Sequence, residues 1–380
     1  MRKRMLSQDI AKGLGILFVV QLHGLQLTKA FFYSWAALTG FSMPFFFFAS
    51  GYNYRSKGLS PVQSMKKRVL ALLKTYICWT LGVFIVMGIY FLVHKDGSLS
   101  EILKSFAGAV LSESGCKMIG WKLPVALYQH VLGPYWFLQF LITASAIFYL
   151  VADYTLRSFQ RTISVIILLS GITFLFVQFR FFLPWGMHVA PVIAAIMIAG
   201  AKLGKDNRFF DSSPRKAWTV INSVVSLVIV ELIQGFYPAA GILGAGLLGE
   251  TAGGIEILFA FCFAVFGSYF LVNFGKLLEK IPVVSKGLIW CGQHSLIILV
   301  LHRPVAYIIR DVMGLPHFIS GNPLYIERTS FKDVIAFLMI FVIMVPVITA
   351  WDQYKKKRQD RDRRSHDTAQ QPDSKTESGR

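Results

Sequence analysis

The chain has 380 residues, of which 54% are hydrophobic and only 16% are charged, and its formal net charge is +19. A soluble protein of this length could not cover so much apolar surface with so few polar side chains. The composition excludes a soluble enzyme, a secreted disulfide scaffold and a disordered chain. Long apolar runs also exclude a transmembrane barrel, so we expect an all-α, polytopic transmembrane helical bundle.

The apolar segments recur along most of the chain. A membrane-spanning helix needs about 20 mostly apolar residues. Ten segments approach this length, so we predict ten spans, at 10–28, 33–51, 70–93, 136–153, 162–179, 183–201, 217–235, 254–273, 287–309 and 333–350. Three weaker stretches are too short or too broken to span and are expected to be interfacial or re-entrant: 98–112, 120–132 and 239–249.

The basic residues fall unevenly between these segments. With the N-terminus in the cytoplasm, most Lys and Arg residues outside the spans lie in cytoplasmic segments, for example at 2–4, 55–68, 202–216 and 355–358. This asymmetry predicts that both termini are cytoplasmic. It also accounts for the positive charge without a nucleic-acid partner.

The composition changes after Trp351. We predict a transmembrane domain over 1–351 and a disordered, charged cytoplasmic tail over 352–380. The four cysteines, at 78, 116, 262 and 291, have no paired spacing, so we expect neither a disulfide nor a metal site.

The first predicted span carries two ionisable residues, Lys12 and His23. Eleven residues are about three helical turns, so both side chains lie on one face, roughly 16 Å apart along the axis. Ionisable residues inside a membrane are costly and often functional. A structural role is the alternative, in which Lys12 reaches the lipid headgroups and His23 bonds to a neighbouring helix.

The ninth predicted span carries Ser295 and His302, which are seven residues apart and therefore share a face. Arg303 follows directly. These residues either face the interior of the bundle or, for Arg303 in particular, lie at the headgroups near the helix end.

Two further positions are candidates for binding an acceptor. Trp136 belongs to an aromatic run typical of a membrane interface. Arg180 flanks a short outer loop and could face an anionic or sugar acceptor. No motif of a protease, a nucleotide hydrolase or a metal-dependent glycosyltransferase is present.

Five ordered motifs resemble the bacterial membrane-bound acyltransferase 3 family. Residues 9–23 have the basic residue, ten-residue gap and His of its first span, and residues 44–52 read PFFFFASGY, similar to its PFFFFxSG. Residues 67–76 resemble its KR…LLxPY, residues 136–138 its WFL, and residues 292–302 its GxxSL…H. The opening DIAKG resembles the branch of fucose 4-O-acetylase and of capsule and O-antigen O-acetyltransferases. The chain departs from the commoner family pattern at Lys12, Thr75 and Leu299, where Arg, Pro and Tyr are usual.

The resemblance implies an integral-membrane O-acyltransferase of the bacterial cytoplasmic (inner) membrane. It would transfer an acyl group, usually acetyl, from cytoplasmic acyl-CoA to a hydroxyl of a cell-surface polysaccharide or lipid-linked sugar. His23 would be the base or a transient acyl carrier, since its imidazole titrates near neutral pH. Lys12 and His302 would complete the catalytic set, and Trp136 and Ser295 would bind substrate. Arg180, because of its place beside the outer loop, is a further candidate for binding substrate.

The donor would meet the cytoplasmic mouth. Acyl-CoA carries several phosphates, and the densest cations at this mouth, beside Lys12, are Arg55, Lys66, Lys67 and Arg68. Acetyl-CoA would be a substrate, with no permanently bound cofactor. Two alternatives remain at this point: a glycolipid transporter or flippase whose path is lined by Lys12 and His23, and a structural subunit of a polysaccharide export complex.

The predicted topology can be tested with reporter fusions. Fusions at Lys57 and Asp206 should report a cytoplasmic position, because these residues lie in the Lys- and Arg-rich segments 55–68 and 202–216. A fusion at Lys117 should report an extracytoplasmic position. A reporter at Lys57 that reads outside would invalidate the topology.

Overall fold

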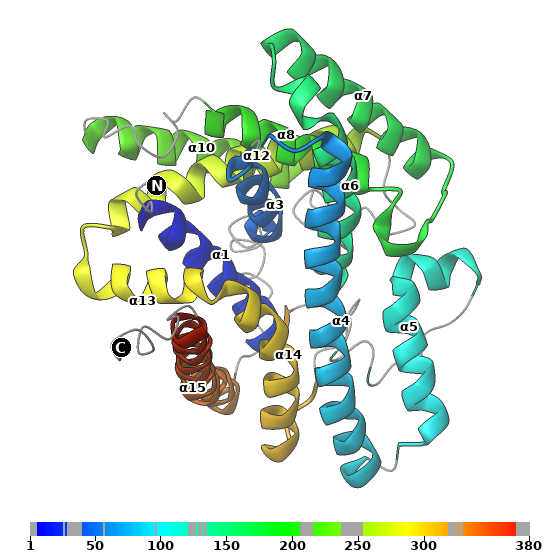
Figure 1. Cartoon of the computed structure of the whole chain (residues 1–380), viewed down its shortest axis with the longest axis vertical. Helices are drawn as coiled ribbons and strands as arrows, with labels where there is room; N and C mark the ends of the chain where they lie inside the picture. The colour runs from blue at the N-terminus through cyan, green and yellow to red at the C-terminus, as the bar shows by residue number, and fades with distance from the viewer. Residues whose placement is uncertain are drawn as a thin grey trace, which may run out of the picture.

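The computed structural model describes residues 6–25, 27–28, 40–55, 58–95, 97–120, 127, 131, 135–205, 216–236, 254–317, 325–326 and 330–369. Helices make up almost all of it (Figure 1). Their bounds are α1 (Leu6–Gly24), α3 (Ser42–Tyr52), α4 (Pro61–His94), α5 (Leu99–Met118), α6 (Trp136–Thr155), α7 (Phe159–Gln178), η3 (Pro184–Gly186), α8 (Ala190–Lys205), α10 (Lys216–Phe236), α12 (Gly254–Leu278), α13 (Pro282–Gln293), α14 (Ser295–Val312) and α15 (Phe331–Ala369). Two strands of two residues, β1 (Leu27–Thr28) and β2 (Tyr325–Ile326), pair in parallel.

Six stretches of the described helices are long and apolar enough to cross a membrane: α4, α6, α7, η3 with α8, Phe259–Leu278 of α12 and Phe331–Lys357 of α15. The α13–α14 pair is a seventh if its two helices count as one span. This confirms an all-α, polytopic membrane protein. The count of ten spans stays a prediction: the apolar part of α10 is short, residues 33–39 of the second segment lie outside the described residues, and so does 239–249.

The ninth predicted span, 287–309, is not one continuous helix. It breaks at His294, where α13 and α14 meet at 84°. Figure 1 shows α13 running across the view and α14 turning downward from its end. His294 helps to hold the bend, since its Nδ1 bonds to the Trp290 carbonyl and its Nε2 pairs with the Asp352 carboxylate. A seven-residue spacing still places Ser295 and His302 on one face, because both lie within α14.

The last helix also differs from expectation. We predicted a disordered tail from residue 352, but α15 continues to Ala369. Lys, Arg and Gln, which fill this stretch, are good helix formers and can extend an existing helix at little cost. Residues 370–380 lie outside the described part of the chain, and the division into 1–351 and 352–380 stays a prediction.

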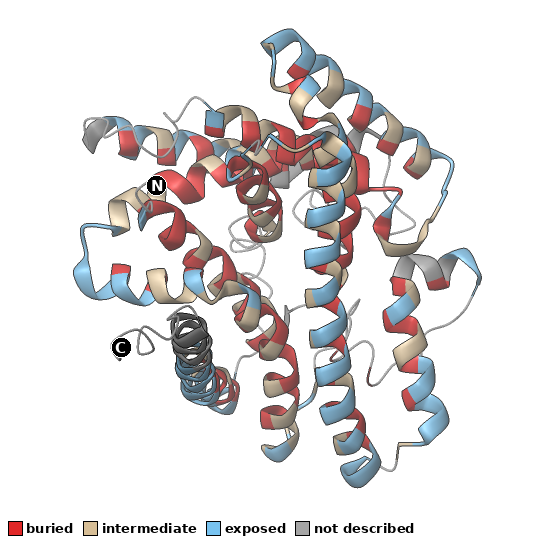
Figure 2. Cartoon of the chain, viewed as in Figure 1, coloured by how far each residue is buried: buried red, intermediate tan, exposed pale blue. Residues whose placement is uncertain are grey.

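Burial separates the inner helices from the outer ones (Figure 2). In the span that contains α8, 78% of the most apolar 18-residue stretch is buried. In α7 the buried share of the corresponding stretch is 17%. α4 likewise keeps an exposed face, which includes Leu70, Ile85, Val86 and Val93. The exposed apolar faces of α4 and α7 are suited to contact lipid, and α1, α3 and α8 form the interior.

The interior helices cross at glycines. A Cβ atom at Gly292 would lie 1.9 Å from the Asp9 carbonyl oxygen, and one at Gly13 would lie 2.0 Å from the Leu288 oxygen. α1 and α13 therefore approach backbone to backbone. Gly51 makes a similar contact between α3 and α8, 1.9 Å from the Met197 oxygen by the same measure. Such close approach is the usual role of small residues between membrane helices.

Two ion pairs, of which the first is buried, connect the C-terminal end of α14 to the start of α15 and to the end of α4. Arg310, which is 2% exposed, contacts Asp333 at 2.9 Å and donates from Nε to the Pro316 carbonyl. Asp311, next in the chain, pairs with Lys95 at the end of α4. These contacts fix α14 at the end opposite to its bend.

The crossing of α1 and α13 can be tested with two glycines on the same helix. Gly292→Ala should lower the thermal midpoint of the detergent-solubilised protein, because its methyl group would collide with the Asp9 carbonyl oxygen and push α1 away. Overpacking of this kind typically costs about 1–3 kcal/mol. Gly287→Ala is the matched control, since nothing lies within 4 Å of its Cβ position. Size-exclusion profiles after heating measure both, and equal midpoints would contradict the close crossing.

Candidate active site

A cavity of about 580 Å³ lies among α1, α3, α4, α6 and the bend between α13 and α14. The residues that line it are Asp9, Lys12, Ile16, Phe46, Ala49, Ser50, Asn53, Arg68, Ala71, Leu72, Thr75, Phe137, Leu138, Leu141, Tyr149, Gly292, Gln293, Ser295, Leu296 and Leu299. These residues come from segments almost 300 positions apart, and the crossing of α1 with α13 brings the two ends of that range together.

One part of the cavity wall is polar and carries two cations. Lys12 on α1 and Arg68 on α4 both line it. Lys12 Nζ lies 3.9 Å from the Asp9 carboxylate, and Arg68 Nη2 donates to Ser50 Oγ at 3.5 Å. Among the described residues of the lining, Asp9 is the one acidic side chain against two cations, so the formal charge of this part of the wall is positive. The arrangement suits an anionic ligand.

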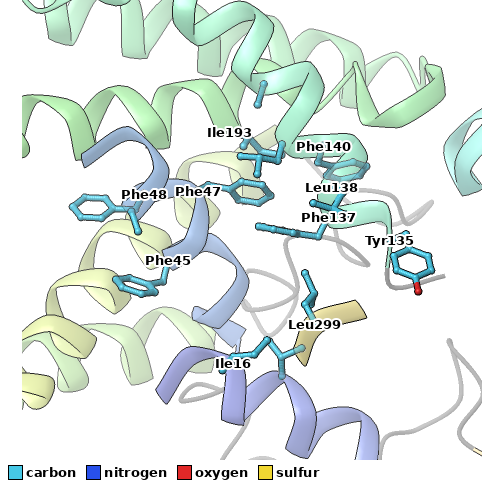
Figure 3. Close-up of a cluster of buried hydrophobic side chains, with 14 of the residues drawn as sticks. Ile16, Phe45, Phe47, Phe48, Tyr135, Phe137, Leu138, Phe140, Ile193 and Leu299 are labelled. Atoms are coloured by element: carbon cyan, nitrogen blue, oxygen red, sulfur yellow. The ribbon is translucent and has the colours of Figure 1, made fainter. Parts of the chain in front are cut away.

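Another part of the wall is apolar. It includes Ile16 of α1, Leu299 of α14 and Phe137 of α6, which converge in Figure 3. Ile16 precedes His23 by seven residues, and Leu299 precedes His302 by three. At 1.5 Å per residue these separations are about 10 Å and about 5 Å along the helix axes. The cavity therefore ends one or two helical turns short of both histidines.

His23 and His302 lie together beyond this apolar end. Their ring centroids are 5.4 Å apart, and the rings are tilted by 33°. Arg303 Nη1 lies 3.5 Å from His23 Nδ1. His302 and Arg303 are 1% and 5% exposed, whereas His23, at the end of α1, is half-buried. We refer to these three residues as the inner cluster.

The structure gives each predicted site residue a definite place. Lys12, Arg68 and Ser295 line the cavity, and His23 and His302 meet in the inner cluster. Ser295 thus faces the cavity as expected, but His302 is not part of its wall. Gly292 and His302 both pack against α1, as the sequence predicts.

The remaining four predicted residues lie outside the cavity wall. Arg55 is exposed and donates to the carbonyl oxygens of Tyr52 and Tyr54. Lys67 is exposed on α4. Trp136 is half-buried and packs against Phe137 and Phe140.

Arg180 is exposed in the turn after α7, where its φ of 55° lies in the left-handed region. It takes no part in the cavity or in the inner cluster among the described residues.

Sequence reasoning missed the polar lining residues Asn53, Tyr149 and Gln293. It left Arg303 open between the interior and the headgroups, and the burial of Arg303 beside His23 places it in the interior. Its position next to His302 was the available signal. Nothing in the sequence marks the other three, because their positions depend on how α3, α6 and α13 pack.

No group of three or more His, Cys, Asp or Glu side chains that could hold a metal ion occurs in the described parts of the chain. The inner cluster consists of two imidazoles and a guanidinium. Such groups can accept a proton, donate hydrogen bonds and stabilise negative charge.

Comparison with known proteins adds one finding. A family model described as an acyltransferase domain, that of the acyltransferase 3 family, matches residues 6–351. No curated protein and no solved structure is significantly similar to the chain. The match includes every residue of the cavity wall and of the inner cluster.

Proposed function

Because this chain belongs to the acyltransferase 3 family, we propose that it is an O-acyltransferase of the bacterial inner membrane. It transfers an acyl group, most simply acetyl, from cytoplasmic acyl-CoA to a hydroxyl of a cell-surface polysaccharide or a lipid-linked sugar. The observation that carries the proposal is the position of the inner cluster, one or two helical turns beyond the apolar end of a cavity that is also lined by two cations.

The cavity suits the donor. Lys12 and Arg68 attract the phosphates of acyl-CoA, and Arg68 can hold a phosphate in bidentate geometry whereas Lys12 acts as a point charge. Ser295 supplies a hydroxyl within the wall. Arg55 and Lys67, outside the wall, would guide the nucleotide end towards it. The acyl thioester would then lie at the apolar end, nearest to the histidines.

The inner cluster supplies the chemistry. A hydroxyl attacks a thioester poorly until its proton is removed in the transition state, and a neutral imidazole can accept that proton. His23 and His302 are the two candidates, and Arg303 can stabilise the oxyanion that develops on the carbonyl. Lys12 lies roughly 16 Å from His23 along α1 and therefore serves the donor.

The acceptor would reach the inner cluster from the other side of the membrane. Trp136 offers an aromatic ring on which a sugar can stack, and the exposed guanidinium of Arg180 can bind an anionic glycan. Membrane lipids surround the outer helices. No nucleic acid takes part.

The proposal is tested by acyl transfer from radiolabelled acetyl-CoA in membranes that contain the native glycan. Wild-type membranes should label the polymer. His23→Ala should abolish the labelling but leave the amount of inserted protein unchanged, because one polar side chain contributes only about 1 kcal/mol to helix packing. Absence of labelling with the wild-type protein would refute the enzyme and favour a transporter or a scaffold.

Donor binding can be tested with neighbouring cations on α4. Arg68→Glu should raise the KM for acetyl-CoA at least tenfold, because it replaces a cation of the cavity wall with an anion. Lys67→Glu is the matched control, since Lys67 is exposed and outside the wall, and its effect should be only a few-fold. The KM for the acceptor should change little in either variant. Equal effects of the two reversals on donor KM would remove Arg68 from the donor site.

A further inference from the structure

The two histidines of the inner cluster present different nitrogens to their surroundings. His302 Nδ1 lies 3.1 Å from the carbonyl oxygen of Ile298, one turn earlier in α14. A carbonyl oxygen only accepts hydrogen bonds, so Nδ1 must carry the ring proton. His302 Nε2 is fully buried and has no hydrogen-bond partner among the described residues.

A second proton on His302 is unfavourable. It would leave a charged N–H without an acceptor in the interior, directly beside the buried guanidinium of Arg303. Burying a charge without a partner is far more costly than burying a neutral group. In the resting protein His302 is therefore a neutral imidazole whose Nε2 lone pair is open.

His23 has the opposite arrangement. Its Nδ1 faces Nη1 of Arg303 at 3.5 Å. A guanidinium has only N–H donors, so Nδ1 of His23 is the accepting nitrogen and the ring proton lies on Nε2. The lone pair of His23 is thus directed at Arg303, whereas its Nε2–H remains as a donor.

We propose that the two rings divide the reaction between them: His302 Nε2 is the proton acceptor, and His23, held by Arg303, donates a hydrogen bond from Nε2 to the reacting carbonyl. A centroid separation of 5.4 Å allows one reacting group to contact both rings. This inference rests on the proposed acyl transfer, and it differs from the sequence-based expectation that His23 is the base.

The step balances without a further reactant. The acceptor hydroxyl oxygen forms a bond to the thioester carbon while its proton moves to His302 Nε2. The carbon–sulfur bond then breaks, and the CoA thiolate takes the proton back from the His302 imidazolium. His23 Nε2–H and Arg303 stabilise the negative charge on the carbonyl oxygen between these events.

Amide substitutions separate the two roles. In His302→Asn the side-chain amide can still donate to the Ile298 carbonyl, so the packing contact is kept but the base is lost. In His302→Gln the amide reaches the place of Nε2 but is not basic. We expect both to lower kcat by 10²–10⁴-fold, the usual contribution of a general base. In His23→Gln the amide keeps a donor near Nε2, so we expect a loss of no more than about tenfold, smaller than the 10²–10³-fold that complete removal of an oxyanion-stabilising donor usually costs.

The assay uses membranes, the native glycan and radiolabelled acetyl-CoA, with binding of the same donor measured in each variant. The donor site contains neither histidine, so binding should equal that of wild type and shows that a variant is folded. An active His302→Asn protein would show that His302 has only a structural role and would overturn the inference. A loss of kcat in His23→Gln as large as the losses in both His302 variants would overturn it as well. In either case an active wild-type enzyme would leave the proposed function intact, whereas an inactive wild-type protein would refute that function itself.

Discussion

The close crossing of α1 with α13 sets the geometry on which the site depends. Gly13 and Gly292 let the two backbones approach so closely that a single methyl group on either would collide with a carbonyl oxygen of the other helix. The bend at His294 then directs α14 along the second half of α1, where His302 meets His23. One crossing therefore forms a wall of the cavity and also assembles the inner cluster. Because helices in lipid gain little from burying apolar side chains against one another, such backbone proximity is a main source of their specificity.

The distribution of charge follows from the same arrangement. Lys12 and Arg68 lie in a cavity wall, where an anionic ligand can offset their charge. Arg303 is enclosed beside two imidazoles, which makes a further positive charge there unfavourable. Proton uptake by an imidazole becomes easier only when negative charge develops close by, as it does on the carbonyl oxygen during acyl transfer. In the proposed reaction, the buried guanidinium would thus couple acceptance of the proton to formation of the oxyanion.

Much of this could be predicted from the sequence, because apolar runs and motif spacing are local signals. The all-α membrane fold, the shared face of Lys12 and His23 and the pairing of α1 with the ninth segment all follow from such signals. The bend at His294 could not be predicted, since 287–309 is apolar enough to read as one span and the break depends on contacts with Trp290 and with Asp352 on α15. The separation of Arg68 from Lys67 was equally hidden: both are cations of one basic run, and only the rotation of α4 places Arg68 towards the cavity.

In the proposed transfer of an acyl group across the membrane, the apolar end of the cavity would act as a barrier. Ile16 and Leu299 are the residues of the cavity wall nearest to the histidines along α1 and α14, and Phe137 lies close to them in Figure 3. In the proposed reaction, water and ions that enter with the donor would meet a hydrophobic barrier there. A short acyl group is apolar and could lie among these side chains, whereas the phosphates of the proposed CoA donor could not. The barrier would therefore admit the part of the donor that reacts and retain the part that is charged. In the proposed function, the acyl group would pass from a cytoplasmic carrier to a hydroxyl on the far side without a continuous aqueous path.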